Sequence, residues 1–185
     1  MMVVTHDDPK ELKENFKKRI DSIKEESKEY YLKLYGNPII FLSVNFLLRL
    51  ERAIEEFLGD MAREIIYSLG ILRGQESAEK LIEVIGIREY SSLALEEKLK
   101  YALNMLFLNG VGSLSLELSE DCNVIKLKTN KTNAAIYKDG RIVSYVLGYA
   151  TGFLSKILEK KLDVSNVREV NDLIIIDYKV VENGF

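Results

Sequence analysis

The chain has 185 residues, 47% of them apolar, which is enough for one substantial hydrophobic core. Its 26 Lys and Arg against 29 Asp and Glu give a net charge of −3, without the basic excess of most nucleic-acid-binding proteins, so we do not expect nucleic acid as a partner. No apolar run approaches the roughly 20 residues of a membrane-spanning helix. The single Cys excludes an internal disulfide, and the start MMVVTHDDPK lacks a secretory-signal pattern, so we expect a cytoplasmic location. Charged residues at 30% are typical of a thermophilic protein.

A long helix is predicted from Asp8 to Tyr35, ended by Gly36 and Pro38. Its apolar residues are spaced by alternating steps of four and three, and the seam is interrupted at Ser27. They are Phe16, Ile20, Ile23, Tyr30 and Leu34. Residues 7–35 carry eight basic and eight acidic side chains, whereas a membrane-surface helix is usually more basic. We therefore assign residues 1–36 to a solvated amphipathic helix that forms a dimer contact.

Four shorter amphipathic helices are predicted next, at 43–58, from Asp60 to Gly70, at 76–85 and at 92–108. Gly59, Gly70, Gly74 and Gly86 provide the breaks between them. The residues expected to face inward on the first two helices are Val44, Leu47, Leu48, Ile54, Phe57, Leu58, Met61, Ile65, Ile66 and Leu69.

After Gly110 the apolar period changes to two, at 113–118 and again at 125–128, which predicts a β-hairpin with one buried face. A loop through Asp139 and Gly140 leads to a helix at 142–158. Two more strands follow at 162–170 and 173–181, joined by a tight Asn171-Asp172 turn. This order predicts an α+β fold, with N-terminal helices packed on an antiparallel sheet of about four strands, made of two hairpins separated by a helix.

The helix at 142–158 carries a broad apolar stripe and, on another side, a row of small residues. The row consists of Ser144, Gly148, Gly152 and Ser155. An interior Gly costs a helix about 1 kcal/mol relative to Ala, so the row predicts that another segment packs very close to Gly148 and Gly152.

Residues with obvious chemistry are few. His6 is the only His and lies in a terminus expected to be mobile, and Cys122 falls in a predicted turn without a second Cys. We therefore name no catalytic residue, metal or cofactor. The segment from Lys126 to Arg141 has five basic residues and one acid, which indicates either an anion-binding patch or a solubilising strand face.

Four aromatic residues lie beside the predicted core faces: Tyr67, Tyr145, Tyr149 and Phe153. Such residues either pack in the core or line an apolar ligand cavity. We name them as candidates for a ligand pocket.

Three segments together resemble the 4-vinyl reductase domain family: MAREIIYSLG at 61–70, the strand at 110–118, and the helix segment GYATGFL at 148–154 with its two trailing strands. The resemblance covers roughly residues 39–181, and we assign 37–185 to this domain. The family is similar in structure to the haem-type nitric-oxide sensor fold and to the acyl-chain-binding subunits of the vesicle-tethering TRAPP complex. The resemblance implies a cytoplasmic α+β domain, often dimeric, with a cavity for a small hydrophobic molecule or acyl chain.

This chain departs from the family where many members have cysteines that look like a metal site. The corresponding residues here are about Val143, Glu169 and Ile176, so metal binding is not carried over. Three functions follow in order of preference: a homodimeric module that binds a small hydrophobic ligand, an assembly protein that uses the N-terminal seam and the Gly148/Gly152 face, and a tetrapyrrole vinyl reductase. The reductase ranks last because the sequence has no nucleotide-binding fingerprint.

Overall fold

The computed structural model describes residues 1–8, 10–12, 14, 17–18, 33–34, 37–38, 43–119, 124–131 and 135–181. Its helices are α2 (Val44–Leu58), α3 (Met61–Ile85), α4 (Ile87–Ser92), α5 (Leu95–Leu108) and α6 (Ser144–Leu158). The strands of the main sheet are β1 (Met2–Thr5), β4 (Leu114–Leu118), β5 (Val124–Asn130), β8 (Leu162–Val170) and β9 (Leu173–Val180). Two short antiparallel pairs are formed by β2 (Lys33–Leu34) with β3 (Asn37–Pro38) and by β6 (Tyr137–Lys138) with β7 (Arg141–Ile142). This arrangement confirms the predicted α+β class.

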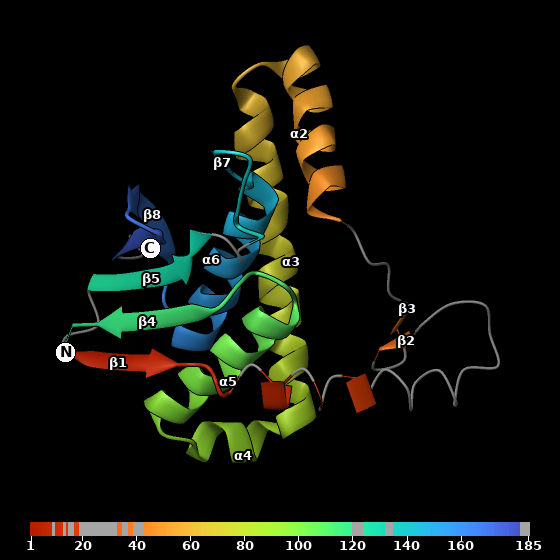
Figure 1. The fold of residues 1–185 in the computed structure, drawn as a ribbon. Helices are drawn as coiled ribbons and strands as arrows, with labels where there is room; N and C mark the ends of the chain where they lie inside the picture. The colour runs from red at the N-terminus through yellow and green to blue at the C-terminus, as the bar shows by residue number, and fades with distance from the viewer. Residues whose placement is uncertain are drawn as a thin grey trace.

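The main sheet has the order β1-β4-β5-β9-β8, and all neighbouring strands are antiparallel (Figure 1). The register aligns Val4, Leu116, Leu127 and Ile176 in one buried row across four strands. Charged residues alternate with them and point to the opposite face, because successive side chains of a strand lie on opposite sides. One face of the sheet is therefore available to the helices and the other is polar.

The fifth strand, β1, is the difference from the predicted four. Four residues at a chain terminus give little sequence signal, and β1 is a strand because it pairs with the edge of β4. The segment after it is fixed to α5: the Asp7 carboxylate accepts a hydrogen bond from Asn104 Nδ2 at 2.7 Å and lies 2.6 Å from Lys100 Nζ. The hydrogen bond from Lys100 lowers the pKa of Asp7 below its ordinary value. His6 packs on Phe107 with the ring centroids 4.8 Å apart, so this segment also contacts α5 through an aromatic pair.

The predicted helix at 8–35 lies largely outside the described residues. Within them, residues 10–12, 14 and 17–18 are helical, whereas Lys33–Leu34 pairs as a strand with Asn37–Pro38. The helix therefore ends before Tyr35.

The core is built in layers, with α5 and α6 next to the sheet and α3 packed along α6 (Figure 1). Breaks in α3 were predicted at Gly70 and Gly74, and both were wrong, because α3 continues from Met61 to Ile85. The two glycines lie on its buried face with Ala62, Ile66, Ala78 and Leu81. Tertiary contact with α6 thus outweighs the low helix propensity of Gly. Among the described residues, neither α3 nor any other helix is long and apolar enough to cross a bilayer.

Large apolar side chains are exposed along α2 and α3. Phe57 is 86% exposed and Met61 63%, so their predicted inward positions were wrong, as were those of Leu58, Ile65 and Leu69. On α3 the reason is that the face with Gly70, Gly74 and Ala78 packs against α6, so Met61, Ile65 and Leu69 lie outside. On α2 the buried side chains are Leu48 and Glu51, and Phe57 and Leu58 are exposed. We call this surface the apolar stripe. It consists of Phe46, Leu50, Phe57, Leu58, Met61, Ile65, Leu69 and Leu72.

Candidate ligand-binding site

A cavity of about 220 Å³ lies where α2, α3, α6 and the segment after α5 meet. Its apolar lining residues are Val44, Leu47, Val111, Ala135 and Val146. Its polar side is formed by Arg73, Ser77, Asn109, Tyr145 and Tyr149. Small-molecule sites typically combine apolar walls with convergent polar groups, and both kinds of residue line this cavity.

Close contact between the backbones of α3 and α6 determines the shape of the polar side. A Cβ atom added at Gly70 would lie 2.3 Å from the carbonyl oxygen of Tyr145, and one at Gly74 would lie 2.1 Å from that of Tyr149. These are the two tyrosines that line the cavity. On the other helix, a Cβ at Gly148 or Gly152 would lie 2.1 Å from a backbone oxygen of α3. The four glycines therefore bring Arg73 and Ser77 of α3 next to Tyr145 and Tyr149.

The Tyr149 hydroxyl interacts with other polar groups that line the cavity. Its hydroxyl accepts a hydrogen bond from Asn109 Nδ2 at 3.0 Å. Burial raises the pKa of Tyr149 above its ordinary value, and hydrogen bonding by Ser77 and the charge of Arg73 offset part of this effect. Burial likewise raises the pKa of Tyr145. Both phenols are therefore neutral at pH 7 and retain a proton to donate to a ligand.

The other two aromatic candidates pack away from the cavity. Phe153 is fully buried in the core, with its ring 6.0 Å from that of Tyr149. Tyr67 lies near Thr151 and Tyr178, and its buried hydroxyl meets no hydrogen-bonding atom at good geometry among the described residues. Burial raises the pKa of Tyr67. The structure thus brings Tyr145 and Tyr149 together at the cavity, and Tyr67 and Phe153 are not among the residues that line it.

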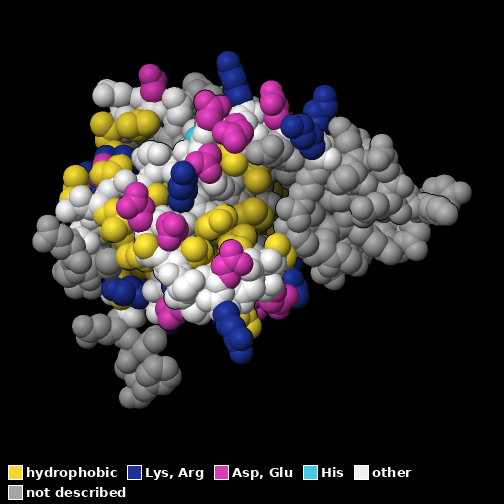
Figure 2. Space-filling view, turned by 90° about the horizontal axis from the view of Figure 1, so that it is seen from below, with side chains coloured by type: hydrophobic (Ala, Val, Ile, Leu, Met, Phe, Trp, Pro, Cys, Tyr) yellow, Lys and Arg dark blue, Asp and Glu magenta, His cyan; other side chains and the backbone are white. Residues whose placement is uncertain are grey.

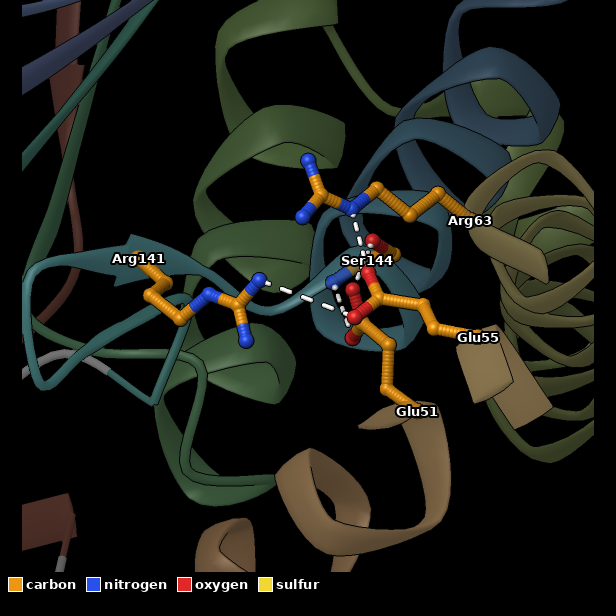
Figure 3. A network of polar contacts seen from close by, with 5 residues as sticks. All are labelled: Glu51, Glu55, Arg63, Arg141 and Ser144. Carbon is orange, nitrogen blue, oxygen red and sulfur yellow. Dashed lines mark hydrogen bonds and ion pairs between the residues drawn. The ribbon is translucent and has the colours of Figure 1, made fainter. Parts of the chain in front are cut away.

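A buried carboxylate joins α2, which carries Val44 and Leu47, to the start of α6 (Figure 3). Glu51 is only 4% exposed, and its two oxygens accept hydrogen bonds from Ser144 Oγ at 2.7 Å and Ser144 N at 3.3 Å. One turn later on α2, Glu55 accepts a hydrogen bond from Arg63 Nε at 2.6 Å and lies 3.7 Å from Arg141. The hydrogen bond from Arg63 lowers the pKa of Glu55. These contacts hold one wall of the cavity against the N-terminus of α6.

Sequence reasoning missed Glu51, Arg73, Ser77 and Asn109. Glu51 had a usable signal, because it follows Val44 and Leu48 at helical spacing on the inward face of α2. Arg73 had none, because the predicted break at Gly74 placed it in a loop. Ser77 and Asn109 lie on separate segments that only the fold brings together.

The other sequence candidates lie apart from the cavity. In the segment from Lys126 to Arg141, the basic side chains face acids of other elements or neighbouring positions, such as Lys128 with Glu117 at 2.5 Å and Lys131 with Glu169. Its excess of positive charge is therefore balanced locally. Cys122 lies outside the described residues. Within the described part of the chain, no group of three His, Cys, Asp or Glu side chains is arranged to hold a metal ion.

Comparison with known proteins bears on the fold. No protein-family model matches the sequence, and no curated protein sequence matches it. The structure is similar to the phenol-responsive sensory domain of the transcription activator PoxR, solved with phenol, with a TM-score of 0.63 and 18% identity over 91% of each chain. It also matches a T. tengcongensis H-NOX mutant, with a TM-score of 0.42 and 16% identity over 96% of this chain and 95% of that one. The first of these similarities shows that the chain shares the fold of that domain.

Proposed function

We propose that this protein is a small-molecule-binding sensory module that acts without catalysis, related to the 4-vinyl reductase domains. The observation that carries the proposal is the cavity between α2, α3 and α6, which is lined by both apolar residues and polar groups. The similarity of fold to a sensory domain solved with phenol supports it. The cavity volume of about 220 Å³ suits a molecule with one ring or a short chain.

Filling the cavity should abolish binding. Ser77→Leu adds a branched side chain at the cavity wall, and we expect it to remove saturation-transfer signals from phenol, benzyl alcohol and phenylacetate that wild-type protein gives in ligand-observed NMR. Ser68→Leu is the matched control, because Ser68 is exposed on the same helix. Loss of the signals in the Ser77 variant alone supports the site. Absence of binding by wild-type protein, or equal binding by both variants, would contradict the proposal.

A second role, self-assembly, is favoured by the apolar stripe. Exposed apolar surface of this kind marks interaction sites, and two antiparallel helices that pair with their own copy across a two-fold axis form a four-helix bundle. At the end of the molecule near α4 and α5, hydrophobic side chains lie among acidic and basic ones (Figure 2). The Gly148/Gly152 face does not serve assembly, because α3 of the same chain covers it. We therefore propose that the protein is a homodimer that uses the stripe.

Charge in the stripe should separate the subunits. We expect Leu69→Lys and Phe57→Lys to convert a dimer to a monomer in size-exclusion chromatography with light scattering, because two like charges would face each other across the two-fold axis. Ile87→Lys, on exposed α4, is the control and should remain dimeric. If the N-terminal seam is the contact instead, Ile20→Lys will separate the subunits and Leu69→Lys will not. That result would return the dimer contact to residues 1–36.

A further inference from the structure

The cavity has a charge of one sign. Arg73 is the single ionised side chain among its described lining residues, and no described carboxylate lines it. The nearest acid on the same helix, Glu76, accepts a hydrogen bond from Arg73 Nη1 at 3.1 Å, and its side chain is 63% exposed. Glu76 therefore holds the guanidinium from the solvent side. A guanidinium has five donors, so this contact leaves others free for a ligand.

Other hydrogen-bond donors share the polar side with Arg73. Asn109 donates to the Tyr149 hydroxyl at 3.0 Å, which leaves the proton of Tyr149 available for another acceptor. The charge of Arg73 acts on the hydroxyls of both Tyr145 and Tyr149 and partly offsets the effect of burial on their pKa values. Arg73 and both tyrosines line the same cavity. The charge of Glu76 has the opposite effect on the pKa of Tyr145, so the positive charge that a ligand meets here is partly balanced by Glu76. A ligand at this end also meets several N–H and O–H groups.

The other residues that line the cavity are apolar. Val44 and Leu47 come from α2, Val111 and Ala135 from connecting segments, and Val146 from α6. A ligand that matches both kinds of lining residue has an apolar body and one anionic head that accepts several hydrogen bonds. A cationic head would face the guanidinium, and a neutral head would form weaker hydrogen bonds with it.

We propose that the cavity binds small carboxylates of about ten non-hydrogen atoms, an aromatic or short aliphatic acid with its carboxylate on Arg73 and its hydrocarbon part against α2. This assignment rests on the proposed ligand-binding function and names its ligand class. Arg73 is a binding residue in this assignment, and Tyr149 with Asn109 orients the carboxylate.

The test compares acids with their neutral amides on the full chain. Phenylacetate and octanoate are titrated by calorimetry beside phenylacetamide and octanamide, which keep the shape and lose the charge. We expect at least one acid to bind about tenfold more tightly than its amide. We expect a difference in affinity no larger than this because the Arg73 side chain is 57% exposed and solvent screens its charge. Arg73→Gln should remove the difference, and Glu76→Gln should increase it by releasing the guanidinium.

Lys80→Gln is the matched control, because Lys80 forms an equivalent ion pair with Glu83 on the same helix and does not line the cavity. It should leave the preference for acids unchanged. Acids and amides that bind equally well, in wild type and in Arg73→Gln, would overturn the carboxylate assignment and leave the binding function standing. If neither acids nor amides bind, the carboxylate assignment is wrong, and the binding function is wrong as well if phenol and benzyl alcohol give no saturation-transfer signal.

Discussion

Gly148→Ala and Gly152→Ala are each expected to lower the free energy of unfolding by more than about 3 kcal/mol, or to prevent folding. In an isolated helix the same substitution is stabilising by about 1 kcal/mol, so the sign of the effect reports the helix contact directly. The added Cβ would lie 2.1 Å from the carbonyl oxygen of Tyr67 or of Ile71, a distance that real Cβ contacts do not reach. Both neighbours are backbone atoms, so no side-chain rotation relieves the overlap. Urea denaturation followed by circular dichroism measures the change.

A matched control separates this contact from general effects of alanine. Ser68→Ala changes an exposed position of α3 and should alter the free energy of unfolding by less than about 0.5 kcal/mol. Gly70→Ala and Gly74→Ala probe the same interface from the opposite helix and should behave like the two α6 variants. Four stable variants would show that α3 and α6 do not pack at this separation.

Removal of the buried carboxylate of Glu51 is expected to have the second largest effect. Glu51→Ala leaves the Ser144 N–H and hydroxyl without their acceptors at the N-terminus of α6, and removes a negative charge that the helix dipole stabilises. We expect a loss of about 2–3 kcal/mol in the free energy of unfolding. Glu51→Gln keeps the shape and one acceptor oxygen, so about 1 kcal/mol is expected for it. Thermal and urea unfolding of the purified variants provide the measurement.

Glu55→Gln is the comparison for this prediction, because Glu55 lies one turn away on α2 and forms exposed ion pairs with Arg63 and Arg141. Exposed pairs contribute little, so we expect less than about 1 kcal/mol. The order Glu51→Ala, Glu51→Gln, Glu55→Gln is the decisive result. An alanine variant as stable as wild type would mean that α2 is not joined to α6 through this carboxylate.

The parts of the fold that follow from local pattern were predictable. The alternation at 113–118 and 125–128 predicted β4 and β5, and the Asn171-Asp172 turn predicted the β8–β9 hairpin. Asn171 has a φ of 54°, in the left-handed region that this residue type tolerates. These signals reside within a few residues, so no tertiary information was needed to find them.

The errors arose where tertiary contact decides the outcome. Gly70 and Gly74 end a helix by propensity, yet the close approach of α6 makes them part of a continuous α3. The large residues Met61 and Leu69 were expected inside, but the glycines and alanines of α3 face α6 instead. At the cavity, Tyr145 and Tyr149 were found from one helix face, whereas Arg73 and Asn109 are 36 residues apart and only the fold makes them neighbours.

Because α3 and α6 are in backbone contact, the residues that set the spacing of the helices differ from the residues that contact a ligand. The spacing of the helices depends on four positions without side chains, and none of these four is among the residues that line the cavity. Substitutions at Arg73, Ser77 or Asn109 can therefore change what the cavity recognises while the helices keep their distance. Single substitutions among the lining residues can therefore change the ligand preference, because contact between the main chains of α3 and α6 keeps the two helices in place.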